Sequence, residues 1–244
     1  MDKDTEQPKP EKSKTWTYFP TAKILLWSKG LKYRSRIVED FGPDLERLVD
    51  YLTGTMYEHN GVGLAAPQIG CFVRVAVVQL IEDRTRPPLI LVNPTIVNSA
   101  GNCVEWEGCL SVPGDRTRAR IARAHFLKVL FQDITGASQE LECAGMMARA
   151  VAHEVDHLDG KFYFDHISAL KRDVIVGHYR GAVKKKDPED LLRSFMYTCP
   201  FENSVAIPAV AREDKNKEFK PVSAFDALQQ KHQEGREQHA INAG

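Results

Sequence analysis

Apolar residues in the first half of the chain form two different patterns, and each pattern predicts a type of secondary structure. Between residues 43 and 56 they recur at the three- and four-residue spacing of an α-helix, and Pro43 suits its first turn. Residues 72–80 and 89–97 are instead rich in β-branched and apolar residues, which predicts buried strands.

The second half predicts a hairpin followed by a helix. Residues 126–132 and 139–143 form two strand patterns, joined by the turn sequence Asp133-Ile134-Thr135-Gly136. A helix is expected over residues 145–158, with Gly160 as its C-terminal cap. Strands followed by one core helix, rather than regular alternation of strands and helices, indicate an α+β fold with mixed or antiparallel sheets around that helix.

Polar segments at both ends set the expected domain boundaries. Residues 1–15 contain little to bury and are expected to form a disordered tail. A single catalytic domain is expected over residues 16–183, and a linker with a short helix over 184–199. Residues 200–244 are a polar extension that we expect to be largely disordered.

Composition narrows the classes of function. The 244 residues are 43% hydrophobic and carry 33 basic and 33 acidic residues, so net charge gives no reason to expect sequence-specific nucleic-acid binding or an anionic membrane as partner. No apolar run approaches the roughly 18 residues of a membrane span. The first residues lack the apolar region of a secretory signal, and five cysteines without framework spacing fit a reducing compartment. We therefore expect a cytoplasmic protein.

The stretch His153-Glu154-Val155-Asp156-His157 carries the clearest chemistry. Residues four apart lie on one face of a helix, so His153 and His157 can bind one cation together. Glu154 could then reach a metal-bound water without being a ligand. This H-E-x-x-H pattern indicates metal-assisted hydrolysis but leaves the third ligand open. Asp156 points away from the pair and could orient a neighbouring group.

Two upstream segments extend this motif. Residues 61–70 read Gly-Val-Gly-Leu-Ala-Ala-Pro-Gln-Ile-Gly, and residues 107–113 read Glu-Gly-Cys-Leu-Ser-Val-Pro. Together with residues 153–160 they resemble, in order, the three motifs of the peptide deformylase family. The resemblance covers roughly residues 20–180. It implies a peptide-deformylase-like domain and a hydrolase of protein biosynthesis, which removes the formyl group from the N-terminal N-formylmethionine of nascent polypeptides and releases formate.

The resemblance also implies roles for individual residues. Cys109 becomes the third metal ligand beside His153 and His157, a metal-bound water is the nucleophile, and Glu154 acts as general base and then acid. The side-chain amide of Gln68 and the backbone N–H of Leu110 are expected to stabilise the oxyanion. Fe(II) is the typical ion of the family, with Zn, Ni or Co as substitutes. The donor set does not choose among them, because it also suits zinc.

The substrate site is expected around the same helix. Glycine at position 63 lets the backbone approach closely, and an extended segment there could pair with a peptide by strand addition. Positions 146, 149 and 150 share or border the face of His153 and, with Val62, could form the methionine pocket. Ordinary core packing is the alternative for Met146. The predicted substrate-binding residues are Val62, Gly63, Gly108, Met146, Arg149 and Ala150.

Two other functions stay open at this point. A zinc metalloprotease would take its third ligand downstream, where Asp165 and His166 are available. A non-catalytic relative would bind only metal or peptide, although it would not need Glu154, Gln68 and Cys109 together. The chain also departs from the family pattern, since Ala152 stands where many relatives carry glutamine, residues 18–31 match loosely, and the tail has no obvious counterpart. Expected partners are formylated nascent peptides and, transiently, the ribosome, which Lys184–Lys186 could contact.

Overall fold

The computed structural model describes residues 19–80 and 86–183. Every described residue belongs to one compact unit of the chain. The predicted N-terminal tail, the linker with its short helix and the polar extension lie outside the described residues. The elements are η1 (Lys29–Lys32), α1 (Pro43–Glu58), β1 (Gly63–Ala65), η2 (Ala66–Ile69), β2 (Val75–Val78), β3 (Leu89–Ala100), β4 (Cys103–Glu107), β5 (Ala119–Arg123), β6 (Phe126–Gln132), β7 (Ser138–Ala144), α2 (Gly145–Leu158), η4 (Tyr163–His166) and α3 (Ala169–Val183).

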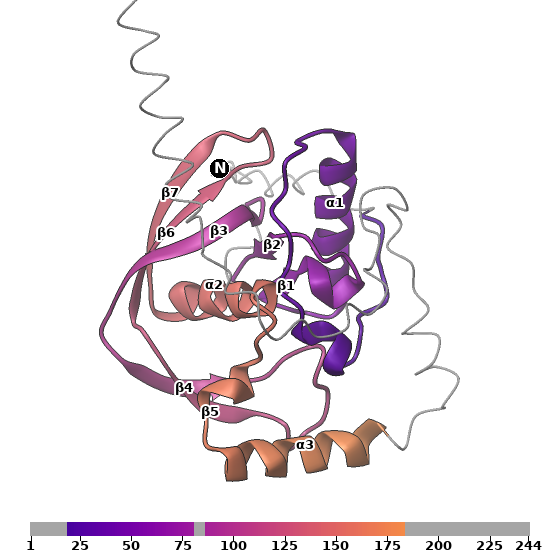
Figure 1. Ribbon diagram of the computed structural model, residues 1–244, viewed down its shortest axis with the longest axis vertical. Coiled ribbons are helices and arrows are strands. Elements are labelled where there is room, and N and C mark those ends of the chain that lie inside the picture. Colours follow the sequence, from indigo (N-terminus) through magenta and orange to yellow (C-terminus); the bar gives the residue numbers. More distant parts are fainter. Residues whose placement is uncertain (1–18, 81–85, 184–244) are drawn as a thin grey trace, which may run out of the picture. The chain divides into compact units, whose positions relative to one another are not determined.

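Two antiparallel sheets surround the helix α2 (Figure 1). The larger sheet has the strand order β1-β2-β3-β6-β7, and β4 pairs only with β5 in a two-stranded sheet. Every pairing between these strands is antiparallel. The predicted α+β fold with a central helix is therefore confirmed.

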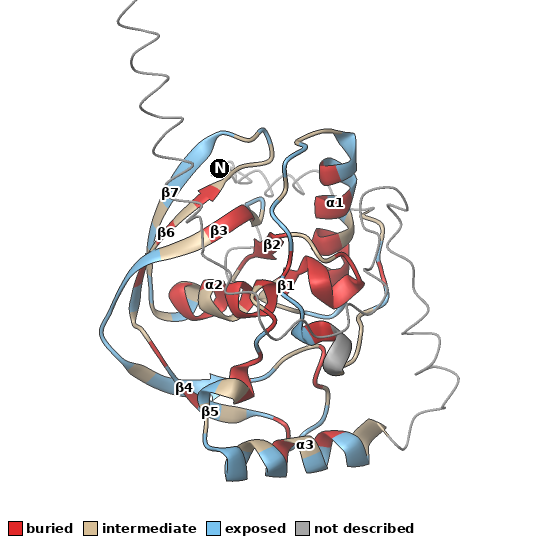
Figure 2. Cartoon of the chain, viewed as in Figure 1, coloured by how far each residue is buried: buried red, intermediate tan, exposed pale blue. Residues whose placement is uncertain are grey.

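The strand β2 is buried on both faces because a helix covers each side. Val75 and Val77 pack into the cluster that contains the apolar face of α1. Val78, which points to the other face of the sheet, packs with Val151 and Val155 of α2. Figure 2 shows this concentration of buried residues in α1, α2 and the strands between them. The continuous apolar sequence of β2 is the result of this double burial.

The predicted α1, hairpin and α2 are all observed. In the hairpin turn, Asp133 Oδ1 accepts hydrogen bonds from the N–H of Thr135 and Ala137, and Gly136 has φ of +87°. Past the end of α2, Gly160 has φ of +72°, and a Cβ there would lie 2.6 Å from the carbonyl carbon of Lys32. Only glycine suits that position.

Several elements were not predicted from the sequence. The strand β1 has only three residues, β4 exposes most of its side chains, and β5 buries only Ile121 and Arg123, so none of the three gives a long apolar run. The helix α3 buries only Ile175 and Tyr179, while Leu170 and Val174 are exposed. Its weak segregation of polar and apolar residues explains why it was missed.

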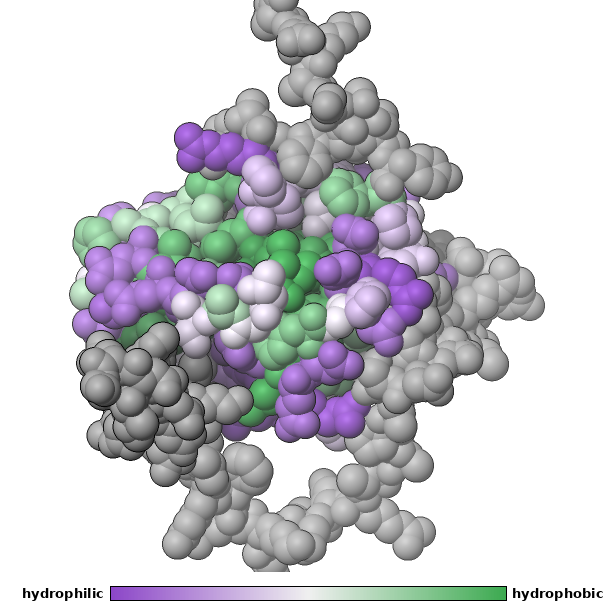
Figure 3. Space-filling model, turned by 90° about the horizontal axis from the view of Figure 1, so that it is seen from above, coloured by the Kyte–Doolittle hydropathy of each residue, from purple (hydrophilic) through white to green (hydrophobic). Residues whose placement is uncertain are grey.

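Cysteine chemistry and surface character complete the fold. Cys103, Cys109 and Cys143 are free thiols, whereas the fully buried Cys71 is disulfide-bonded. One face of the domain gathers hydrophobic residues in its middle, bordered by hydrophilic ones (Figure 3). Within the described part of the chain, none of the helices combines the length and the apolar character that a membrane crossing requires.

Candidate metal centre

The helix α2 places His153 and His157 side by side. Their ring centroids are 4.9 Å apart and the rings are nearly perpendicular, at 85°. His157 is buried and His153 is half-buried. The C-terminal end of α2 is held by Arg74, whose Nη1 donates to Asp159 Oδ1 at 2.7 Å. The two imidazoles are thus fixed on a well-anchored helix.

Cys109 reaches the two histidines from the loop that follows β4. A backbone hydrogen bond from Val112 N–H to the Cys109 carbonyl, at 2.9 Å, tightens this loop. Cys109 Sγ lies 3.2 Å from His157 Nε2, and the candidate ligand atoms of Cys109, His153 and His157 all lie within 4.8 Å of one another. One thiolate and two imidazoles at these separations can share a divalent cation and leave a position open.

Glu154 lies buried next to this cluster with one oxygen unsatisfied. Its side chain is only 3% exposed, and Oε2 has no hydrogen-bond partner within residues 19–80 and 86–183. Burial raises the pKa of Glu154 to about 7, although the charges of His153 and Arg123 act in the opposite direction. A buried carboxylate oxygen without a partner is costly. It fits a site that receives a water molecule and a cation, so the donor set suits a hydrolytic metal.

Gln68 is locked with its amide nitrogen toward the sulfur ligand. Its Oε1 accepts from the backbone N–H of Ala65 at 2.9 Å. Its Nε2 lies 3.2 Å from Ser111 Oγ and 3.5 Å from Cys109 Sγ. Leu110 directly follows Cys109 in the chain. Its side chain packs beside the loop before β1, where Cδ1 would lie 3.1 Å from a Cβ added to Gly61. Both predicted oxyanion residues therefore border the cluster.

The predicted substrate residues are arranged unevenly around the helix. Ala150 is buried, and Val62 packs against the same apolar cluster. Gly63 lies directly against Glu154, since a Cβ there would come within 2.9 Å of Glu154 Cδ. Met146 is 52% exposed, so the alternative of core packing is wrong for it. Gly108 is also exposed.

Arg149 requires a correction to its expected place in the substrate site. Its guanidinium forms an ion pair with Glu107 and donates to the carbonyl oxygens of Ile121 and Cys103 at 3.0 and 2.7 Å. The residue is only 5% exposed. The helical spacing placed its Cα correctly, but the long side chain extends to β4 and β5 instead of toward a ligand.

Glu107 is the residue at this site to which the sequence analysis gave no role. Its carboxylate is contacted by Arg123, Arg149 and the Nδ1 of His153. Burial alone would raise the pKa of Glu107, but hydrogen bonds from His153 and Arg123 outweigh it and hold that pKa well below the usual range. The available signal in the sequence was that Glu107 stands directly before Gly108 and Cys109 in the second motif.

Asp156 and the two downstream candidates belong to a different set of contacts. Asp156 Oδ2 accepts from Arg123 Nη1 and from His166 Nε2, both at 2.6 Å. The expectation that Asp156 orients a neighbouring group is therefore confirmed. Asp165 accepts from the N–H of Phe162 at 3.0 Å and pairs with Lys32. Neither His166 nor Asp165 belongs to the three-ligand cluster, which leaves the metalloprotease reading without its third ligand.

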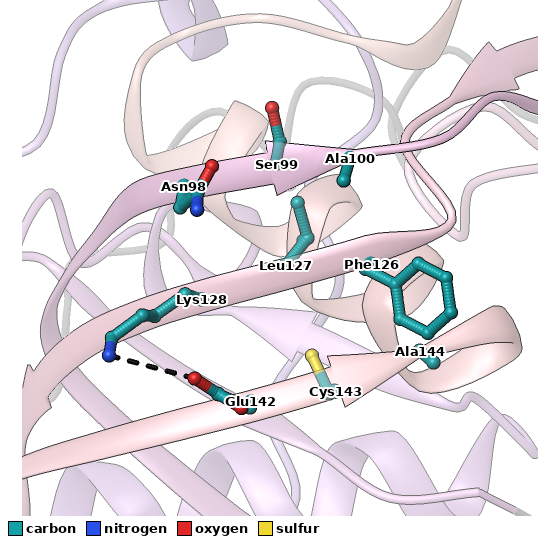
Figure 4. A pocket seen from close by; sticks show the side chains of 9 residues that line it. All are labelled: Asn98, Ser99, Ala100, Phe126, Leu127, Lys128, Glu142, Cys143 and Ala144. Carbon is teal, nitrogen blue, oxygen red and sulfur yellow. Dashed lines mark ion pairs between the residues drawn. The ribbon is translucent and has the colours of Figure 1, made fainter.

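A separate pocket of about 400 Å³ opens on the strands β3, β6 and β7 (Figure 4). Lys128 spans it to pair with Glu142 at 3.6 Å, and Cys143 lines it. It shares no residue with the Cys109 cluster. The residues suited to hydrolysis therefore lie at the cluster of Cys109, His153 and His157 and not in this pocket.

Comparison with known proteins gives a consistent result. The model of the family described as "Polypeptide deformylase" matches residues 22–173. A peptide deformylase of Mesorhizobium japonicum is 40% identical over 171 residues, which are 69% of this chain and 96% of that protein. One from Thermodesulfovibrio yellowstonii is 41% identical over 145 residues, which are 59% of this chain and 87% of that protein.

Solved structures agree with the sequence matches. A crystal structure of a peptide deformylase from Legionella pneumophila aligns with a TM-score of 0.63 at 35% identity, covering 69% of this chain and 99% of that one. The peptide deformylase of Ehrlichia chaffeensis in complex with actinonin aligns with a TM-score of 0.62 at 31% identity, covering 68% of this chain and 98% of that one.

Proposed function

We propose that this chain, which belongs to the polypeptide deformylase family, holds its catalytic metal with Cys109, His153 and His157 and uses Glu154 as its general base. Members of this family are metal-dependent hydrolases that remove the N-formyl group from nascent polypeptides. The assignment of roles to residues is our proposal. Its main support is the unpartnered Oε2 of Glu154, buried beside three candidate ligands.

A divalent cation held by such a donor set supplies acidity to a water molecule and polarises a carbonyl oxygen. The chain's own groups do the remaining work. Glu154 accepts the proton of the attacking water at its free oxygen and returns it to the departing amine, so formate and a free N-terminus result. A pKa raised by burial prepares a carboxylate for such transfer near neutral pH.

Charge on the formyl oxygen is stabilised by two fixed donors in this proposal. The Gln68 amide is held by Ala65 and Ser111, so its N–H direction costs no reorganisation during the reaction. The backbone N–H of Leu110, directly after the sulfur ligand, is the second donor.

The substrate peptide is proposed to extend along β1. This strand ends the sheet order β1-β2-β3-β6-β7, and it lies against Glu154 at Gly63. An edge strand offers backbone groups to an extended peptide. Val62 and Ala150 supply apolar surface for the methionine side chain, with exposed Met146 at the border of the pocket.

The proposed native ion is Fe(II), with Zn, Ni or Co as functional substitutes. The deciding experiment is metal analysis of anaerobically purified full-length protein, combined with an assay of formate release from a formyl-Met peptide. One equivalent of bound iron and release of formate would support the proposal. Release of formate by protein that contains another ion would overturn the assignment of iron but not the proposed site or reaction. Absence of both would overturn the site.

Two further proposals concern the surroundings of the enzyme. Because its substrates are nascent chains, we propose that the enzyme is located where translation takes place, in the cytoplasm. For the same reason we propose that it contacts the ribosome transiently. The lysines 184–186 that suggested this contact lie outside the described residues. Cosedimentation of the full chain with ribosomes at two salt concentrations tests the contact, because binding to RNA phosphates weakens as salt rises.

A further inference from the structure

A continuous chain of polar side chains runs from the candidate ligand His153 to His166. His153 Nδ1 lies 3.1 Å from Glu107 Oε2, and Glu107 accepts two hydrogen bonds from Arg123 at 2.8 and 2.9 Å. Arg123 donates in turn to Asp156 Oδ2 at 2.6 Å, and His166 Nε2 contacts the same oxygen at 2.6 Å. The order is thus histidine, carboxylate, guanidinium, carboxylate, histidine.

The middle of this chain is buried, while its outer end is accessible. Glu107, Arg123 and Asp156 are 6%, 8% and 9% exposed, but the side chain of His166 is 35% exposed. Charge-assisted hydrogen bonds at such sites are short and strong, and breaking one leaves an uncompensated buried charge. A change at one of the three inner groups therefore affects the hydrogen-bond partners of the next.

The direction of each proton follows from the chemistry of the carboxylates. Glu107 and Asp156 each form a buried ion pair with the Arg123 guanidinium, at 2.8 and 2.6 Å, which favours the ionised form of both carboxylates. Ionised carboxylates can only accept, so Nδ1 of His153 and Nε2 of His166 carry the protons. His153 is left with its Nε2 lone pair for a cation.

Arg149 fixes the inner carboxylate from the other side. It pairs with Glu107 while donating to the backbone carbonyls of Ile121 and Cys103. Glu107 is consequently tied to α2 and to both strands of the small sheet. Any change in the position of Arg123 acts directly on Glu107 and, through Glu107, on His153.

We propose that His166 is a positioning residue for the metal centre, acting through Asp156, Arg123 and Glu107 on the ligand His153. This inference rests on the proposed function, since it requires His153 to bind the metal. Without the His166 N–H, Arg123 is the remaining hydrogen-bonding partner of the Asp156 side chain within residues 19–80 and 86–183, so the contact between Asp156 and Arg123 is held less firmly. The geometry of Glu107 and the orientation of the His153 ring then become less defined, which weakens metal binding.

The test measures Zn(II) affinity of the full-length protein by competition with a chromophoric chelator. Removing a carboxylate partner of a ligating histidine typically weakens metal binding by about 10- to 100-fold, which is the expectation for Glu107→Gln. His166→Ala should weaken it by roughly two- to tenfold, the range in which such networks transmit coupling. His166→Gln, whose amide can still donate to Asp156, should recover most of the affinity. His178→Ala is the matched control, because it removes another exposed histidine, on α3.

A double-mutant cycle decides whether the effect travels through the chain of contacts. Adding His166→Ala to Glu107→Gln should cause no further loss of affinity, because the connection is already broken. The same cycle with Asp156→Asn serves if Glu107→Gln fails to fold. His166→Ala affinity equal to that of His178→Ala, or losses that simply multiply in the double variant, would overturn the inference. If the wild type fails to bind one equivalent of Zn(II), the proposed function fails instead, so the two failures are distinguishable.

Discussion

The backbone of Gly63 and the carboxylate of Glu154 are in direct contact. A Cβ at position 63 would lie 2.9 Å from both Cδ and Cγ of Glu154, closer than real Cβ contacts allow. The strand β1 thus sets the position of the proposed base, in addition to presenting an edge to the substrate.

Gly63→Ala should therefore lower turnover on a formyl-Met peptide by at least about tenfold, because small displacements of a catalytic group are costly. Metal content should be unchanged, since no ligand is touched. The assay compares kcat, bound metal and thermal unfolding with those of Gly177→Ala, where a Cβ meets nothing within 4 Å. A wild-type kcat in Gly63→Ala would show that Glu154 tolerates the displacement.

Glu154→Gln should retain the metal but lose about two to four orders of magnitude in turnover, because an amide cannot accept the proton of water. The measurement is kcat together with metal content on the same preparation. A loss of less than about tenfold with the metal retained would remove Glu154 from the role of base.

Cys109→Ser should bind Zn(II) and Fe(II) more weakly and show much lower activity, because a hydroxyl stays protonated at neutral pH and is a poor ligand. Cys103→Ser provides the control, since Cys103 is also a free thiol in β4 but lies outside the cluster. Equal metal affinity in the two variants would place Cys109 outside the metal site.

Tyr179 should contribute to alkaline unfolding. Burial raises its pKa to about 12, and its hydroxyl donates to the Trp27 carbonyl at 2.9 Å. In the unfolded chain a tyrosine loses its proton near pH 10, so the stability that protonated Tyr179 contributes is fully present below that pH and is lost as pH rises from about 10 to about 12.

Tyr179→Phe should consequently show a shallower fall in unfolding free energy over that interval, measured by denaturant titration at several pH values. Tyr163, whose pKa burial also raises, keeps part of the slope in the variant. If the free energy of unfolding falls with pH at the same slope in wild type and Tyr179→Phe, then Tyr179 has the same pKa in the folded and unfolded states.

The sequence predicted α1, β2, β3, β6, β7 and α2 because their patterns reflect burial directly. Strand β6 and helix α2 were predicted with the observed bounds, and the side chains of β6 alternate between buried and less buried along the strand. The pair β4 and β5 was missed because exposed Trp106 and Val104 remove the apolar pattern.

The proposed ligands were named from motifs, whereas their supporting contacts required the fold. Arg149 illustrates the difference, because helical spacing gives the position of a Cα but not the destination of a long side chain. Glu107 and Arg123 are 16 residues apart on paired strands, and nothing local to either residue indicates that they meet. Such pairs become visible only once strand register is known.

The separation of Cys109 from His157 by 48 residues has a consequence for the enzyme's own synthesis. At about 5 to 20 residues per second, the ribosome adds His157 roughly two to ten seconds after Cys109. During that interval the thiol exists without the imidazoles that would share a cation with it. The complete ligand set therefore exists only after His157 has been added, so metal loading is necessarily a late event in the maturation of each new copy.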